Sequence, residues 1–189
     1  VFLPIVNGVI TTTNDLAVNL QKKGHRVIFI TPGWKGYREP EIYGIPIYYV
    51  PSLPSHMYAG LRLVWPWTKK VDEIIEKEQV DVMHITGPFL LTWTAIKAAH
   101  RHQIPVLHTF HTLLYEDKYL YYVFRTKLMV PLLRRFAWKY LGRYITHSDY
   151  MTAPSQYACD VIEEQFPGVK VEHIRNGITL QDFEQFEDF

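Results

Sequence analysis

The residues whose types and spacing could do chemistry gather in one stretch, from Pro105 to Asp117. An apolar run follows the proline, as in a buried parallel strand, and where that strand should end two histidines, two threonines and an acidic pair crowd together. We take His111 as the candidate functional side chain, because the carboxylates of Glu116 and Asp117 follow it closely and could orient or deprotonate a hydroxyl group. The alternatives are that His111 only hydrogen-bonds the neighbouring backbone and that the carboxylates cap the next helix.

A metal site is a further interpretation of the histidine pair, His108 and His111. Structural and catalytic metal sites need at least three protein ligands as a rule, and no third ligand lies at a convincing spacing here. The remaining histidines are scattered along the chain. The sequence therefore predicts no metal at this position.

A second candidate is the turn at Asn7, Gly8 and Val9, between the tail of an apolar strand and the start of a helix. A glycine lets the backbone approach a ligand closely, and the exposed N–H groups of a helix N-terminus attract a phosphate group. Taken alone, Asn-Gly is foremost a turn dipeptide, so a purely structural turn is the simpler interpretation.

Charge placement is the strongest physical feature. Between Lys118 and His147 there is no Asp or Glu, and aromatic residues lie among the basic ones, which are Lys118, Arg125, Lys127, Arg134, Arg135, Lys139 and Arg143. Such a basic, aromatic helix suits an anionic bilayer surface, where each cation contributes on the order of 1 kcal/mol. Trp65 and Trp67 could supply a second interfacial anchor. The alternatives are a solvated basic face and a nucleic-acid surface, and no recognition-helix motif supports the latter.

Strand and helix patterns alternate along the chain, which predicts an α/β fold with a doubly wound parallel sheet, Rossmann-like, covered by helices on both faces. Strands are expected at 25–31, 43–50, 81–85, 105–111, 150–155 and 169–174. Helices are expected between the turn at Gly8 and Gly24, at 63–78 apart from Pro66, and at 89–102. Further helices are expected over most of 118–147, with an interruption at Pro131, and from a cap at Ser155 through Phe166. Only a stub of a strand precedes Gly8, so we expect the natural chain to continue upstream of Val1.

The composition fits a globular domain, with 189 residues and 48% hydrophobic content. The net charge of +1 says nothing by itself about partners. Cys159 is the single cysteine, so no internal disulfide can form and a reducing compartment is expected. No window supplies the apolar run of a membrane span, and no signal peptide is visible, so we expect a soluble or peripheral protein.

Several short motifs follow one another along the chain: Pro4-Ile-Val-Asn-Gly-Val9, Lys23-Gly-His-Arg-Val27 with Thr31-Pro32, His108-Thr-Phe-His-Thr112, Thr152-Ala-Pro-Ser155 and Asn176-Gly-Ile178. In this order they resemble the amino-terminal domain of family 4 retaining glycosyltransferases of the GT-B fold, and the resemblance covers essentially the whole chain. The run Tyr115-Glu-Asp117 with the basic aromatic segment after it is most similar to diacylglycerol glucosyltransferases and related lipid glycosyltransferases.

The resemblance implies that residues 1–189 form one of the two lobes of a GT-B enzyme, with the active site between the lobes. Asn7, Gly8 and Val9 would approach the donor diphosphate, and His111 would lie beside the donor sugar. Tyr115 and the basic segment would bind the acceptor and contact the membrane. The carboxyl-terminal domain, absent here, would grip the nucleotide and carry a pair of glutamates, so this fragment alone is expected to be inactive.

The loop at Asn176 and Gly177 would lie at the donor site as well. The family usually has aspartate after Asn-Gly-Ile, where this chain has Thr179, and proline before it, where this chain has Arg175. These departures put the role of the loop in question.

The reaction implied is transfer of a hexose, with glucose from UDP-glucose favoured, to diacylglycerol with retention of configuration. The expected partners are the nucleotide sugar, diacylglycerol or a related lipid, an anionic membrane surface and the missing domain, with no nucleic acid, no metal and no cofactor. The enzyme would be cytoplasmic and peripheral on the inner face of the cell membrane.

Three other interpretations stay open. One is a family 4 enzyme with another lipid or a soluble acceptor. Another is a non-catalytic module that binds lipid or a partner through the basic segment. The third is an unrelated doubly wound nucleotide-binding protein, which is disfavoured because no G-x-G-x-x-G motif follows the opening strand.

Overall fold

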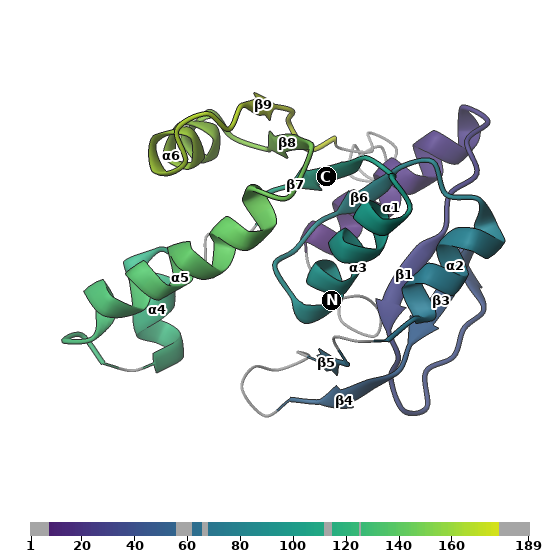
Figure 1. Ribbon diagram of the computed structural model, residues 1–189, viewed down its shortest axis with the longest axis horizontal. Coiled ribbons are helices and arrows are strands. Elements are labelled where there is room, and N and C mark those ends of the chain that lie inside the picture. Colours follow the sequence, from purple (N-terminus) through teal and green to yellow (C-terminus); the bar gives the residue numbers. More distant parts are fainter. Residues whose placement is uncertain (1–7, 56–61, 66–67, 112–114, 125, 178–189) are drawn as a thin grey trace, which may run out of the picture. The chain divides into compact units, whose positions relative to one another are not determined.

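The computed structural model describes residues 8–55, 62–65, 68–111, 115–124 and 126–177 (Figure 1). The chain divides into two compact units. The first comprises the residues up to Lys70 together with those from Arg175 onward, and the second runs from Val71 to Ile174. The strand stub predicted before Gly8 lies outside the described residues.

In the first unit a helix packs against a small sheet. Its elements are α1 (Gly8–Lys22), β1 (Phe29–Pro32), β2 (Glu41–Ile42), β3 (Ile45–Val50), β4 (Ser52–Pro54) and β5 (Arg62–Val64). β1 and β3 are parallel, β2 lies antiparallel to β3, and β4 and β5 form a separate antiparallel pair. Ile10 and Ala17 lie on one face of α1, because they are seven residues apart, and pack against Phe29, Ile45 and Ile47. This cluster is the core of the unit.

The second unit is built on a parallel sheet with the strand order β6-β7-β8-β9. Its elements are α2 (Lys70–Glu78, which begins at the boundary of the units), β6 (Met83–Ile85), α3 (Leu90–Arg101), β7 (Val106–Thr109), α4 (Asp117–Phe124), α5 (Val130–Ile145), β8 (Tyr150–Ala153), α6 (Gln156–Gln165) and β9 (Val171–His173). Leu141 and Ile145 of α5 and Ile162 of α6 are fully buried in one core cluster with Met151 and Ala153 of β8. The parallel sheet is thus anchored to α5 and α6.

This architecture confirms the predicted α/β class, a Rossmann-like lobe in which parallel strands alternate with helices. The cap of α6 is confirmed in detail, because the Ala158 N–H donates to the Ser155 hydroxyl at 3.2 Å. The antiparallel pairs around β2 and β4 were not predicted. β2 has two residues and β4 has three, which is too short for an alternating pattern to stand out.

One predicted helix began in the wrong place. Leu63 lies in β5, and the helix predicted at 63–78 starts only at Lys70, where the Lys70 N–H donates to the Thr68 hydroxyl at 3.2 Å. Pro66 explains the difference, because a proline disfavours the helical conformation for the residue before it and cannot donate a helix hydrogen bond.

Two boundaries in the second unit also differ. β7 ends at Thr109, so His111 lies two residues past the strand rather than at its last position. Pro131 does not interrupt the long helical segment but lies in the first turn of α5, where its missing N–H costs little. The break between α4 and α5 instead lies before Val130.

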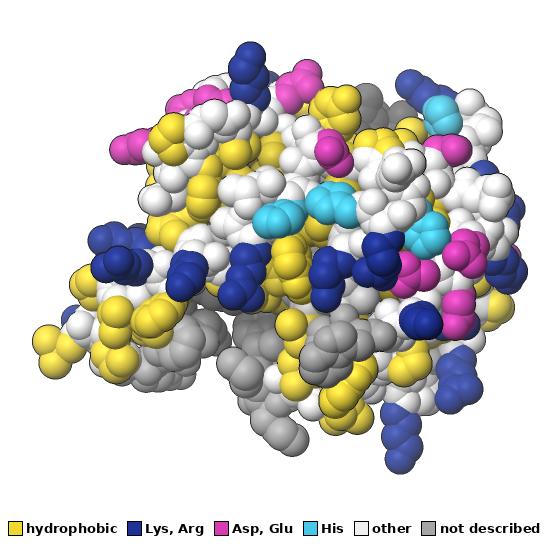
Figure 2. Space-filling model, in the orientation of Figure 1, with side chains coloured by type: hydrophobic (Ala, Val, Ile, Leu, Met, Phe, Trp, Pro, Cys, Tyr) yellow, Lys and Arg dark blue, Asp and Glu magenta, His cyan; other side chains and the backbone are white. Residues whose placement is uncertain are grey.

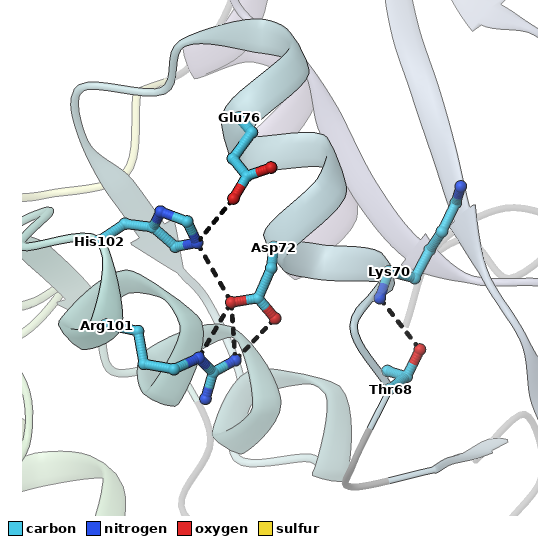
Figure 3. Close-up of polar contacts among 6 residues, drawn as sticks. All are labelled: Thr68, Lys70, Asp72, Glu76, Arg101 and His102. Carbon is cyan, nitrogen blue, oxygen red and sulfur yellow. Dashed lines mark hydrogen bonds and ion pairs between the residues drawn. The ribbon is translucent and has the colours of Figure 1, made fainter.

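A cluster of charged side chains joins α2 to the end of α3 (Figure 3). The Arg101 guanidinium donates to both carboxylate oxygens of Asp72, with Nη2 2.7 Å from Oδ2 and Nε 3.0 Å from Oδ1. His102 Nε2 lies 3.2 Å from Asp72 Oδ1 and 4.0 Å from Glu76 Oε1. Burial by itself would raise the pKa of Asp72, but the hydrogen bonds and charges of Arg101 and His102 outweigh it and hold that pKa below its usual range.

We expect Asp72→Asn to lower the free energy of unfolding by about 1 kcal/mol at pH 7, because the bidentate contact with the half-exposed Arg101 is lost. A carboxylate whose pKa is depressed on folding stabilises the fold above its unfolded pKa, near 4, and the contribution disappears as pH falls through the folded value. The difference between wild type and variant should therefore vanish in acid. Urea unfolding at several pH values measures it, with the exposed Asp81→Asn as the control. A gap that does not shrink as the pH falls below 4 would contradict the assignment.

Candidate active site

The carboxyl ends of β6, β7 and β8 carry a row of hydrogen-bonded polar side chains. Thr109 and Thr152 are register partners on β7 and β8, and their hydroxyl oxygens lie 2.8 Å apart. On the other side of Thr109, its hydroxyl oxygen lies 2.7 Å from Nε2 of His84 on β6. His84, Thr109 and Thr152, here called the polar row, thus cross three strands at the edge of the sheet where ligands of open α/β sheets bind.

The imidazoles at this edge are held in the neutral form. Burial, and then the charge that His111 would carry, lowers the pKa of His84 to about 4. His108, with 1% of its surface exposed, has a pKa of about 3, because of burial first and then of His84 and His111. Nδ1 of His108 has no hydrogen-bond partner within the described part of the chain. Both rings are therefore uncharged at physiological pH.

His111, the candidate functional side chain, follows β7 and is half-buried. Burial lowers its pKa as well, so its imidazole is neutral over a wider pH range than an exposed histidine would be. Because a charge on His111 lowers the pKa of both His84 and His108, the three imidazoles lie within electrostatic reach of one another. A neutral imidazole at the edge of a parallel sheet can accept or donate one hydrogen bond to a bound sugar or hydroxyl group.

The carboxylates predicted to act with His111 have other partners. The Tyr157 hydroxyl donates to Oε1 of Glu116 at 3.3 Å. Asp117 is the first residue of α4, and its carboxylate accepts from Nη1 of Arg134 at 3.2 Å. A carboxylate in the first turn also favours the helix dipole, which fits the capping alternative. The catalytic roles of Glu116 and Asp117 stay predictions.

Tyr115, predicted to hold the acceptor or the membrane, lies in the core. Its ring stacks on Trp138 with a centroid distance of 4.3 Å, with Phe110 on a parallel plane at 6.5 Å, and 6% of its surface is exposed. Burial, with smaller effects of Tyr157 and Glu116, raises its pKa to about 12. Tyr115 is thus no part of an exposed membrane-facing surface, and acceptor contact stays a prediction.

The basic segment presents one exposed stripe on α5. Leu132, Arg135, Phe136, Lys139 and Arg143 recur at positions i, i+3, i+4, i+7 and i+11, and all five are exposed. Figure 2 shows dark blue side chains in a row at the left of the view, with hydrophobic side chains beside them. Leu132, Arg135, Phe136, Lys139 and Arg143 form what we call the α5 stripe.

Other members of the basic segment surround the stripe. Leu128 and Met129 are exposed just before α5, Leu128 to 96%. Lys118 and Lys127 are exposed, and the Lys127 ammonium lies 5.7 Å from the Tyr121 ring centroid. Arg134 differs, because it pairs with Asp117.

The remaining predicted site residues lie in the first unit or at its edges. Gly8 and Val9 open α1, and a Cβ added at Gly8 would meet no atom of the described residues within 4 Å. Asn176 and Gly177 are exposed after β9, and Trp65 is 61% exposed after β5. Asn7, Trp67 and Arg125 lie outside the described residues.

Within the described residues, no helix has both the length and the apolarity to cross a bilayer. In the same ranges no group of three or more His, Cys, Asp or Glu side chains is arranged to hold a metal ion.

Sequence reasoning did not single out His84, Thr109 and Thr152 as one group. His84 is the middle residue of a three-residue strand, and only the pairing of β6, β7 and β8 brings it to the two threonines. The available signal was that each of them stands at or near the carboxyl end of an expected parallel strand.

The chain was compared with known proteins. A model of Glycosyltransferase Family 4 matches residues 6–182. The chain is 32% identical over 187 residues to alpha-monoglucosyldiacylglycerol synthase of Streptococcus pneumoniae, covering 98% of this chain and 41% of that protein. It is 27% identical to the synthase of the same name from Acholeplasma laidlawii, covering 96% of this chain and 46% of that protein.

A GDP-mannose-dependent alpha-mannosyltransferase of Mycobacterium tuberculosis is 26% identical, with 96% of this chain and 47% of that protein covered. The chain thus spans less than half the length of these curated relatives. Because the family model covers nearly every residue, the chain belongs to glycosyltransferase family 4.

Proposed function

We propose that this chain is the acceptor- and membrane-binding lobe of an enzyme that transfers glucose from UDP-glucose to diacylglycerol. The observation that carries the proposal is the similarity over 98% of the chain to a protein named alpha-monoglucosyldiacylglycerol synthase. UDP-glucose carries its glucose in the α configuration, so an α-linked product corresponds to retention. The rest of the enzyme is a carboxyl-terminal domain that grips the nucleotide.

The roles proposed for the residues are those that the resemblance to family 4 glycosyltransferases implies, and the chemistry of the side chains and backbone supports them. The N–H groups of Gly8 and Val9, at the positive end of α1, receive the donor diphosphate. The neutral imidazole of His111 hydrogen-bonds the glucosyl group as charge develops on its anomeric carbon. Asn176 and Gly177 contribute further polar contacts to the donor. No metal or cofactor takes part in this proposal.

The acceptor lies in a membrane, so the enzyme acts at the bilayer surface on the cytoplasmic side. The α5 stripe combines three cations with two large apolar side chains, Leu132 and Phe136. This combination suits an anionic interface, because the cations attract the head groups while the apolar side chains enter the acyl boundary. Trp65 supplies a second interfacial contact.

A second candidate function is mannosyl transfer from GDP-mannose. It is favoured because a GDP-mannose-dependent alpha-mannosyltransferase aligns with 96% of the chain. The identity in that alignment is 26%, lower than the 32% to alpha-monoglucosyldiacylglycerol synthase. The two functions differ in the donor, which the missing domain selects.

An assay of the complete enzyme with labelled UDP-glucose, UDP-galactose and GDP-mannose tests the proposed donor and acceptor. Diacylglycerol is presented in vesicles with and without anionic lipid. We expect glucose to enter the lipid fraction as the α-anomer, with a rate that rises with anionic lipid and is unchanged by EDTA. Mannose transfer would favour the second candidate, and transfer to water-soluble acceptors without vesicles would contradict the lipid acceptor. No transfer from any donor would favour a non-catalytic binding module.

A further inference from the structure

The polar row crosses the sheet on one face. Side chains alternate along a strand, so Thr109 points to one face of β7 while His108 and Phe110 point to the other, where Phe110 joins the core. In the strand register Thr109 lies opposite Thr152, whereas His84 lies opposite Leu107. His84 therefore contacts Thr109 diagonally across β6 and β7. The contacts of 2.7 and 2.8 Å are those of well-formed hydrogen bonds.

Polar side chains at these positions need an explanation beyond packing. Thr152 is buried, and His84 and Thr109 are half-buried, where valine or leucine would fill similar space without desolvating polar atoms. A satisfied network of this kind costs stability relative to apolar packing but specifies one geometry. His84 is neutral, so Nε2 either accepts from Thr109 or donates to it, and in either case the Thr109 hydroxyl joins both neighbours.

The geometry fixed in this way is that of the chain immediately before His111. Thr109 is the last residue of β7, and the next residue, Phe110, donates its backbone N–H to the Thr152 carbonyl at 2.8 Å. The backbone leaving β7 is thus held to β8 by one main-chain and one side-chain contact, and to β6 through His84. His111 follows after a single further peptide unit.

We propose that His84, Thr109 and Thr152 are positioning residues for the transfer reaction, which fix the carboxyl end of β7 and so the location of His111 relative to the donor sugar. The inference rests on the proposed function, in which His111 contacts the sugar. Misplacing a reacting contact by about 1 Å costs roughly 100-fold in rate, so a network that sets this location affects turnover more than substrate binding.

The test uses the complete enzyme with UDP-glucose and vesicle-borne diacylglycerol. Thr109→Val removes the central hydroxyl at nearly constant volume, and we expect kcat to fall roughly 10- to 100-fold while KM for UDP-glucose changes less than about threefold. Thr109→Ser keeps the hydroxyl and should stay within about threefold of wild type. His84→Leu should resemble Thr109→Val, and His84→Gln, which keeps an amide near the Nε2 position, should recover part of the loss.

The matched control is Thr94→Val. Thr94 is a buried threonine of the same unit, and its hydroxyl donates to the Leu90 carbonyl one turn earlier in α3, at 3.0 Å. The same isosteric change there should leave kcat within about twofold of wild type. Melting temperatures are measured for every variant, and rates are compared below the lowest of them. If Thr109→Val does not fold, Thr152→Val and His84→Leu, which each remove one contact, take its place.

Two outcomes would overturn the positioning role: turnover of folded Thr109→Val equal to that of Thr94→Val, or Thr109→Ser as defective as Thr109→Val. The kcat of the double variant Thr109→Val with Thr152→Val should lie within about twofold of the kcat of Thr109→Val alone, because both residues act through one network. Losses that add up would contradict a shared network. His111→Ala separates this failure from that of the proposed function. If His111→Ala is inactive and Thr109→Val has normal turnover, only the positioning role is contradicted. If His111→Ala is active, the proposed role of His111 in the reaction is contradicted.

Discussion

Replacing His111 by alanine in the complete enzyme is expected to lower kcat for glucosyl transfer by roughly 10²- to 10⁴-fold. The side chain follows the carboxyl end of β7, is half-buried, and carries an imidazole that burial keeps neutral. A neutral imidazole beside the sugar can supply one directed hydrogen bond, and alanine supplies none. Initial rates with saturating UDP-glucose and vesicle-borne diacylglycerol measure the effect.

The control is His25→Ala, an exposed histidine of the first unit, which should keep wild-type turnover. His111→Ala itself should melt within a few degrees of wild type and sediment with anionic vesicles to the same extent, because His111 belongs neither to a core cluster nor to the α5 stripe. Turnover of His111→Ala within about threefold of wild type would remove His111 from the reaction.

The pH dependence of kcat/KM for UDP-glucose tests the same residue, because kcat/KM reports the pKa values of the free enzyme. If the neutral imidazole is the active form, activity is lost as pH falls through the pKa of His111. Burial lowers that pKa from 6.5, so the acid limb should have its midpoint below 6.5. A midpoint above that value would mean that His111 is stabilised as a cation, which would contradict the environment described here.

The sequence predicted those features that depend on local patterns. The helix after Ser155 has a hydroxyl cap and a regular apolar face, and the structure has it at Gln156–Gln165. The apolar run before His108 is likewise a local pattern, and it predicted β7. At Leu63 the helical interpretation was wrong, because Pro66 ends any helix on its amino-terminal side and a strand pair forms there instead.

Features that depend on pairing between distant segments could not be predicted in this way. His84 and Thr152 are separated by almost seventy residues, and the order β6-β7-β8 brings both to Thr109. The burial of Tyr115 has the same origin in part, since its ring stacks on Trp138 of α5 as well as on Phe110 of its own stretch. Local sequence gave Tyr115 the character of an interfacial residue, whereas tertiary packing makes it part of the core.

The difference between Arg134, which pairs with Asp117, and the cations of the α5 stripe also needed the structure. In the sequence Arg134 and Arg135 are equivalent. In the structure Arg134 contacts Asp117 at the start of α4, while Arg135 belongs to the α5 stripe with Lys139 and Arg143. The helical period decides this, because residues 135, 139 and 143 return to one face and residue 134 lies about 100° away from 135.

Reversing the charge of the α5 stripe is therefore best done without Arg134. We expect the complete enzyme with Arg135→Glu and Lys139→Glu to bind anionic vesicles roughly 10³-fold more weakly than wild type. The two substitutions change the charge near the surface by four, and each elementary charge near an anionic surface contributes about 1 kcal/mol. Arg134→Glu would instead place a second carboxylate beside Asp117 and disturb the contact of α4 with α5.

Sedimentation with vesicles of graded anionic content measures the effect, and the wild-type affinity should fall as salt shortens the range of the attraction. Lys22→Glu with Lys23→Glu is the matched control, because it changes the net charge equally at exposed positions around the end of α1. Leu132→Ser with Phe136→Ser should also weaken binding, but with an unchanged salt dependence, since it removes apolar insertion and leaves the cations. Equal vesicle binding by wild type and by the Arg135→Glu, Lys139→Glu variant would show that the α5 stripe does not face the bilayer. If the control variant loses as much binding, the effect comes from net charge alone.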